Sequence, residues 1–178
     1  MKTETNKYIE VLNTNINAIR SITALVRSTI GPKGLDVMLV DEFGNATCTN
    51  DGVEILENIQ IAHPAAKLAV DAAKSQEARV GDGTTATAIL IDSLLASALL
   101  RINSGSRPNR VAKGLEIGIQ EVVKQLEACA KPIQDINDEK LAQITKIAAR
   151  SNTEISDLII NAAQKICQQN PNALVNGD

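Results

Sequence analysis

Residues 81–85 read Gly81-Asp82-Gly83-Thr84-Thr85 and separate two long stretches of helical sequence. Before this break, Pro64 opens a helical stretch to about Arg79, with proline in the first turn, where its missing N–H costs nothing. After it, residues 86–103 consist mainly of Ala, Ile and Leu, a composition typical of helices. Two long helices joined by a glycine-rich turn therefore form the centre of the predicted fold.

The remaining sequence predicts a mostly α fold with a small β-hairpin. Apolar residues at three- and four-residue steps between Asn15 and Ser28 indicate an amphipathic helix. Residues 37–40 and 46–49 are β-like runs on either side of a turn at 42–45, which predicts a hairpin. Further helices are expected over residues 53–58, from Pro108 to a stop at Lys131-Pro132, and over 138–149 and 154–168.

The composition excludes several classes of function. The 178 residues are 44% apolar and 22% charged, so a packed core is expected in one domain or slightly more. A net charge of -3 and only two aromatic residues, Tyr8 and Phe43, argue against nucleic acid as a partner. The single histidine, His63, excludes a metal site built from several histidines.

No membrane partner is expected from the hydropathy pattern. The longest apolar run, Ala86–Leu100, is interrupted by Asp92 and falls short of the about 20 residues that a membrane span needs. It is therefore interpreted as a buried helix. The three cysteines form no CxxC pair and no secretory signal is visible at the N-terminus, which together predict a cytoplasmic protein.

The break at 81–85 has the composition of a site for phosphate and magnesium. Glycine lets backbone N–H groups approach an anion, and Gly83, Thr84 and Thr85 begin a helix whose N-terminus favours negative charge. Asp82 supplies the hard oxygen ligand that Mg²⁺ accepts. The residues alone leave a second interpretation open, a turn with threonine caps, and neither GxxxxGK[ST] nor GxGxxG is present.

Two other glycine breaks leave similar alternatives open. The stretch Thr29-Ile30-Gly31-Pro32-Lys33-Gly34 could set a tight loop against a nucleotide or form a solvent-facing turn. Asp51, in Thr49-Asn50-Asp51-Gly52, could position or deprotonate a water molecule, or cap the short helix behind it.

These three breaks, in this order and with these flanking residues, resemble the chaperonins, the ATP-driven double-ring folding machines. Two further segments, Met38-Leu39-Val40-Asp41 and His63-Pro64-Ala65-Ala66-Lys67, point to the archaeal-type (group II) branch or its bacterial group III-like relatives. The resemblance extends over essentially the whole chain. The segments that carry it are Asn15–Ala18, Thr29–Asp36, Met38-Leu39-Val40-Asp41, Thr49–Leu56, His63-Pro64-Ala65-Ala66-Lys67 and Gly81–Thr85.

The resemblance implies an equatorial-domain-like helical bundle with a small β-hairpin. Residues 1–131 would be the N-terminal half of an equatorial ATP-binding domain, and residues 132–178 the first strip of an intermediate domain. The apical domain and the C-terminal half would be absent from these residues. Because the apical domain binds unfolded clients in this family, clients are expected only for a complete chaperonin.

The resemblance also assigns roles to ten residues at the three breaks. Asp82 is the expected Mg²⁺ ligand, and Asp51 is the expected catalytic residue, near the γ-phosphate of ATP and the attacking water. The hairpin 37–48 would reach a neighbouring subunit of the ring. The other cofactor-binding residues, which would line the nucleotide or cradle its phosphates, are Thr29, Ile30, Gly31, Pro32, Asn50, Gly83, Thr84 and Thr85.

The expected function is therefore an ATP-binding module of a chaperonin that assists protein folding, with Mg²⁺-dependent ATP hydrolysis in the complete machine. Whether the chain is itself an enzyme stays open, because the resemblance places the family's principal catalytic carboxylate outside these residues. The alternative is a non-hydrolysing assembly or interaction module, or a truncated remnant, that associates with itself or with a full-length chaperonin.

Overall fold

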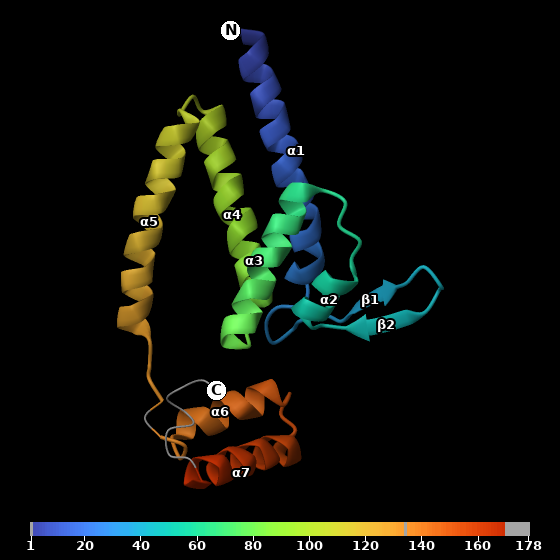
Figure 1. The fold of residues 1–178 in the computed structure, drawn as a ribbon, viewed down its shortest axis with the longest axis vertical. Coiled ribbons are helices and arrows are strands. Elements are labelled where there is room, and N and C mark those ends of the chain that lie inside the picture. Colours follow the sequence, from blue (N-terminus) through green and yellow to red (C-terminus); the bar gives the residue numbers. More distant parts are fainter. Residues whose placement is uncertain (1, 134, 170–178) are drawn as a thin grey trace. The chain divides into compact units, whose positions relative to one another are not determined.

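The computed structural model describes residues 2–133 and 135–169, and the chain divides into two compact units after Gly118. The described residues form seven helices and a two-stranded antiparallel sheet, which confirms the predicted fold class (Figure 1). The elements are α1 (Lys2–Arg27), β1 (Val37–Val40), β2 (Ala46–Thr49), α2 (Gly52–Asn58), α3 (Pro64–Val80), α4 (Thr84–Asn103), α5 (Pro108–Cys129), α6 (Glu139–Ala148) and α7 (Thr153–Gln169).

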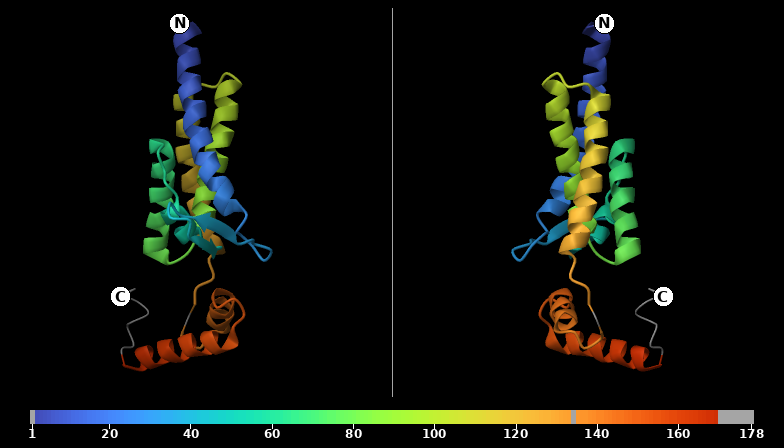
Figure 2. Two further views of the ribbon diagram at one scale, coloured as in Figure 1. Left: turned by 90° about the vertical axis from the view of Figure 1, so that its right-hand side faces the viewer. Right: turned by 90° about the vertical axis from the view of Figure 1, so that its left-hand side faces the viewer.

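The core of the first unit lies where α1, α3 and α4 pack side by side, with the short helix α2 against one end of them (Figures 1 and 2). Alanines on α3 let its neighbours approach closely, because helix axes come nearer when the contact residues are small. Most of the predicted apolar stripe of α1 is buried, but Leu25 is 42% exposed. The central cluster consists of Val26, Ile55, Leu56, Val70, Ala73 and Ala88.

A buried carboxylate ties α4 to α1. Asp92 is only 6% exposed, and its two oxygens accept from Arg20 Nε at 3.4 Å and from Arg27 Nη2 at 3.1 Å. The side chains of both arginines are about half exposed. The residue that interrupts the apolar run of α4 therefore faces α1, where two cations compensate its charge.

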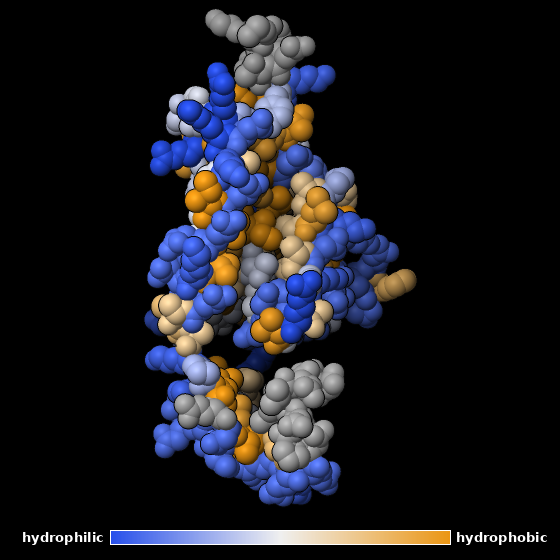
Figure 3. All heavy atoms as spheres, turned by 60° about the vertical axis from the view of Figure 1, so that its left-hand side comes forward, coloured by the Kyte–Doolittle hydropathy of each residue, from blue (hydrophilic) through white to orange (hydrophobic). Residues whose placement is uncertain are grey.

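The expectation that the apolar run of α4 is a buried helix is wrong. The helix continues to Asn103, only Thr84, Ala88 and Asp92 are buried, and Leu90, Leu94 and Leu100 are exposed. The reason is that one face of α4 packs on α1 and α3, while its apolar residues lie all round it. Figure 3 shows apolar side chains at the surface among the hydrophilic ones.

Among the described residues, α4 is the one helix long and apolar enough to cross a membrane, judged by length and composition alone. The helix is longer than the apolar run Ala86–Leu100 judged from the sequence, because it begins at Thr84 and ends at Asn103. A core helix of a soluble protein passes the same test, so this is weak evidence for a membrane span.

The predicted hairpin is formed by β1 and β2, with Val37 opposite Thr49 and Val40 opposite Ala46. Alternate residues of β1 point to opposite faces, so Val37 and Leu39 pack against the core cluster while Met38 and Val40 are exposed. At the tip of the hairpin, Phe43 is 90% exposed.

The hairpin turn is held by Asp41. One carboxylate oxygen of Asp41 accepts from the backbone N–H groups of Phe43 at 2.9 Å and Asn45 at 2.8 Å, and the other accepts from the Asn45 side-chain amide at 2.8 Å. The hydrogen bond from the Asn45 side chain is the largest of the causes that hold the pKa of Asp41 below its usual value. Since these bonds favour the charged form, the turn is stabilised by ionised Asp41.

The pH dependence of this turn gives a first prediction. Because the folded pKa of Asp41 lies below the unfolded value, the stabilisation is fully present above the unfolded pKa of about 3.9 and is lost as the pH falls through the folded pKa. The NMR chemical shifts of the Phe43 and Asn45 amide groups, measured as a function of pH, are expected to change with the ionisation of Asp41. Asn45→Ala should raise its midpoint; an unchanged midpoint would contradict the assigned cause.

In the second unit, α6 and α7 pack against each other. Asp138 caps α6, accepting from the Lys140 N–H at 3.0 Å, and the turn between the helices places Arg150 and Ser151 at positive φ. Both helices were expected at nearly these bounds. The proposed division into domains at residue 131 stays a prediction.

Candidate functional site

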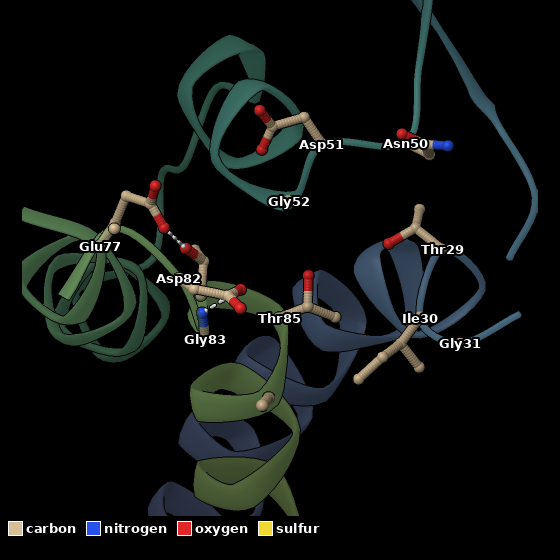
Figure 4. A pocket seen from close by; sticks show the side chains of 13 residues that line it. Thr29, Ile30, Gly31, Asn50, Asp51, Gly52, Glu77, Asp82, Gly83 and Thr85 are labelled. Carbon is tan, nitrogen blue, oxygen red and sulfur yellow. Dashed lines mark hydrogen bonds between the residues drawn. The ribbon is translucent and has the colours of Figure 1, made fainter. Parts of the chain in front are cut away.

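The first unit contains a pocket of about 400 Å³ at the place where the three glycine breaks meet (Figure 4). Its walls come from the loop after α1, the junction between β2 and α2, the end of α3 and the start of α4. Nine of the ten predicted site residues line it. The lining residues are Thr29, Ile30, Gly31, Asn50, Asp51, Gly52, Glu77, Gly81, Asp82, Gly83, Thr84, Thr85 and Ala86.

The turn from α3 into α4 depends on two glycines in the left-handed region. Gly81 ends α3 with φ 74°, and Gly83 precedes α4 with φ 92°, a region that side-chain-bearing residues rarely adopt. Asp82 stands between them, exposed, and its Oδ1 accepts from the Gly83 N–H at 2.6 Å. The tight reversal thereby fixes a carboxylate at the mouth of the pocket.

The N-terminus of α4 offers hydrogen-bond donors to the pocket. A helix leaves its first N–H groups without partners inside the helix, and Gly83, at the capping position of α4, has no side chain to accept from them. Thr84, Thr85 and Ala86 begin this helix and all line the pocket. Unpaired N–H groups and the positive end of the helix dipole favour an anion at this place.

The loop after α1 forms the opposite wall. Thr29 Oγ1 donates to the Val26 carbonyl at 2.8 Å, and the Gly34 N–H donates to the Gly31 carbonyl at 2.9 Å, which closes the loop on itself. The Ile30 side chain is half exposed and supplies an apolar surface to the pocket. Pro32 is exposed and is not among the residues that line the pocket, so its predicted contact with a nucleotide has no support in this geometry.

Asp51 lines the third wall and also caps α2. Its Oδ1 accepts from the Val53 N–H at 2.8 Å, as the capping interpretation expects, and Asp51 is exposed. Figure 4 shows its carboxylate on the junction above the start of α4. The two interpretations of Asp51 are therefore compatible, because one carboxylate can cap the helix and also line the pocket.

Four of the thirteen lining residues were not among the predicted site residues, and two of these, Gly52 and Glu77, make contacts that shape the site. A Cβ on the buried Gly52 would collide with Thr85 Oγ1, so glycine lets the β2–α2 junction approach α4 closely. Glu77 lies in the last turns of α3, and its Oε2 accepts from the Thr84 hydroxyl at 2.8 Å. Gly52 was recognised as part of a glycine break but was given no role at the site, whereas Glu77 looks like an ordinary helix residue.

The pocket is acidic. The lining residues include three carboxylates, Asp51, Glu77 and Asp82, and no lysine or arginine. Since like charges repel, a polyanion needs a divalent cation to bind among these carboxylates. Carboxylate and hydroxyl oxygens are the hard ligands that Mg²⁺ prefers, so the side chains present fit that ion.

The described residues thus form a mostly helical fold with an acidic pocket where loops and helix ends meet. The sequence model of the TCP-1/cpn60 chaperonin family matches residues 22–176, and the chain belongs to this family. It is 36% identical to a thermosome subunit of Methanopyrus kandleri and 38% identical to the thermosome subunit beta of Desulfurococcus mucosus, each over 90% of the chain.

Among solved structures, the chain is similar to a group III chaperonin crystallised in the open state, with a TM-score of 0.79 and 35% sequence identity over 88% of the chain. The match covers 32% of that structure's chain and 31–33% of the two thermosome subunits. The chain therefore spans about a third of the length of the relatives it matches.

Proposed function

We propose that this chain is the ATP-binding part of a cytoplasmic chaperonin and that the pocket at the start of α4 binds ATP together with Mg²⁺. The observation that supports this most is the convergence of nine predicted nucleotide-site residues, from three loops distant in sequence, on one pocket. A volume of about 400 Å³ is within the usual range for small-molecule sites.

The residues of the pocket divide the work between them. Backbone N–H groups at the start of α4 and the Thr85 hydroxyl hold the phosphates, while Thr29, Ile30, Gly31 and Asn50 face the rest of the nucleotide. Asp82, exposed at the turn, would hold the cation. When bound, Mg²⁺ neutralises phosphate charge and stabilises the charge that develops in phosphoryl transfer. Asp51, opposite α4, orients the attacking water.

Calorimetric titration of the full chain with ATP tests the proposal. Binding is expected in excess Mg²⁺ and should be at least about tenfold weaker when a chelator removes the cation. The reason is that the attraction between a cation and a phosphate a few ångströms away contributes more than about 1.4 kcal/mol in a pocket of reduced dielectric, and 1.4 kcal/mol corresponds to a tenfold change in affinity. Absence of binding, or equal binding without the cation, would overturn the proposal.

Turnover gives a second prediction. The chain alone is expected to bind ATP without sustained hydrolysis, since Asp51 is its only proposed catalytic carboxylate and the family resemblance places the principal one elsewhere. Phosphate release under excess Mg²⁺-ATP measures this. Hydrolysis that persists over many turnovers and disappears in Asp51→Asn would show that these residues suffice.

A second candidate function is assembly through the hairpin, in a ring or with a full-length chaperonin. It is favoured by Met38, Val40 and Phe43, which expose apolar side chains on a two-stranded sheet. Light scattering after size exclusion, with and without a full-length chaperonin, tests it. Met38→Lys/Val40→Lys should abolish an association that the wild type shows, and a wild type that stays monomeric in both experiments would exclude this function.

A further inference from the structure

The side chain of Glu77 is the one acidic group of the pocket without a part in the function proposed above. It is half-buried, lies one turn before the end of α3, and lines the pocket. A carboxylate beside a triphosphate repels it, so its presence in the pocket calls for a role that outweighs this repulsion. The hydrogen bonds of Glu77 indicate this role.

Glu77 holds both ends of the turn that joins α3 to α4. Its backbone carbonyl accepts from the Gly81 N–H at 2.7 Å. Its carboxylate accepts from the Thr84 hydroxyl at 2.8 Å, the dashed line that leaves Glu77 in Figure 4. Thr84 is 5% exposed, so this second bond lies where water competes little. The two bonds span the glycines whose left-handed conformations shape the turn.

The preceding residue closes the turn from the same side. The Gln76 side chain lies 3.4 Å from the position that a Cβ on Gly83 would occupy, which is ordinary van der Waals contact. Two consecutive residues of α3, Gln76 and Glu77, therefore contact the segment 81–84. These contacts support the segment from the side of α3.

The direction of the hydroxyl proton separates the two threonines. A hydroxyl has one proton, and Thr84 donates it to Glu77, so this hydroxyl cannot also donate to a phosphate. Thr85 lines the pocket, and Figure 4 draws no hydrogen bond from its hydroxyl to the other lining residues, so that proton is available to a ligand. The two threonines, expected to act alike, thus have different tasks.

We propose that Glu77 is a positioning residue, which orders the phosphate-binding turn by holding the Thr84 hydroxyl, and that Thr85 alone donates a hydroxyl proton to the nucleotide. The inference rests on the proposed ATP function and adds to it a residue that acts through another. Removal of the negative charge of Glu77 is therefore expected to weaken the binding of an anion, the opposite of what charge repulsion alone predicts. The reason is that the disorder of the phosphate-binding turn costs more affinity than the relief of repulsion restores.

Four variants of the full chain, titrated with Mg²⁺-ATP beside the wild type, test this proposal. Glu77→Ala should bind about tenfold to a hundredfold more weakly, the range for loss of a hydrogen bond to a charged group. Glu77→Gln keeps an acceptor oxygen and should restore affinity to within about threefold. Thr84→Val should weaken binding as Glu77→Ala does, with no further loss in the double variant. Asp71→Ala, which removes an exposed carboxylate of α3 outside the pocket, should change nothing.

Hydrogen exchange of the peptide over residues 78–88, measured without nucleotide, gives an independent readout. Exchange should be faster in Glu77→Ala and Thr84→Val than in the wild type, and normal in Glu77→Gln. Tighter ATP binding by Glu77→Ala, or equal loss in Glu77→Gln, would overturn the positioning role while leaving the ATP site in place. A wild type that binds no ATP would overturn the proposed function instead.

Discussion

Replacement of Asp82 by alanine is expected to weaken Mg²⁺-dependent ATP binding by at least about a hundredfold, since even the loss of an outer-shell partner of a metal ligand costs about 10–100-fold in metal affinity. Asp82 is exposed between Gly81 and Gly83, and its Oδ1 already accepts from the Gly83 N–H. Each of the three pocket carboxylates accepts one hydrogen bond, and the family resemblance assigns the cation to Asp82.

Comparison of Asp82→Ala with Asp82→Asn distinguishes a role of Asp82 in binding the cation from a role in shaping the turn. Asp82→Asn keeps an oxygen that can accept from the Gly83 N–H but loses the charge, so it should behave nearly like Asp82→Ala if the role is metal binding. If the role is only to shape the turn, Asp82→Asn should bind ATP like the wild type. Calorimetry at several Mg²⁺ concentrations measures this, and the melting temperature should stay unchanged, because an exposed carboxylate contributes little to packing.

Removal of both arginine partners of Asp92 is expected to destabilise the protein by about 3 kcal/mol, the low end of the about 3–5 kcal/mol typical for a buried charge that loses its partner. The low end applies because Arg20 and Arg27 are half exposed, so water screens part of the attraction. Arg27→Ala alone should cost less, since Arg20 still faces the other carboxylate oxygen.

The matched variant is Asp92→Leu, which replaces the buried charge by an apolar side chain and leaves two arginines free to be hydrated. It should change the free energy of unfolding by less than about 1.5 kcal/mol, because replacement of a buried ion pair by an apolar residue is often neutral or stabilising. Urea unfolding followed by circular dichroism measures all three variants. A loss as large in Asp92→Leu as in the double arginine variant would mean that Asp92 contributes through shape and not through charge.

The elements of this fold could be predicted where the pattern is local. Residues 64–79 and 37–49 contain their own signals, a proline at the helix start and two β-like runs around a turn, and the helix and hairpin lie where these signals place them. The burial of α4 could not be predicted, because its apolar residues point in all directions and the sequence does not say which neighbours cover them.

For the site, the sequence predicted the three loops but not all of their contacts. Gly83 and Thr85 could be singled out because glycine before a helix is a recognisable signal. Glu77 could not, since its role depends on the reversal that brings it next to Thr84. The partners of Asp92 were hidden for a similar reason: Arg20 and Arg27 lie 72 and 65 residues away in the chain.

The lack of lysine and arginine among the residues that line the pocket has a consequence for selectivity. A basic phosphate site accepts sulfate, inorganic phosphate and free nucleotides alike, and such anions compete with its ligand in the cell. If this pocket binds ATP as proposed, its carboxylates should disfavour such free anions, and a triphosphate should bind only as a complex with the metal that masks its charge. Occupancy should then follow the concentration of the metal complex, so that a fall in free magnesium would empty the site even where nucleotide is plentiful.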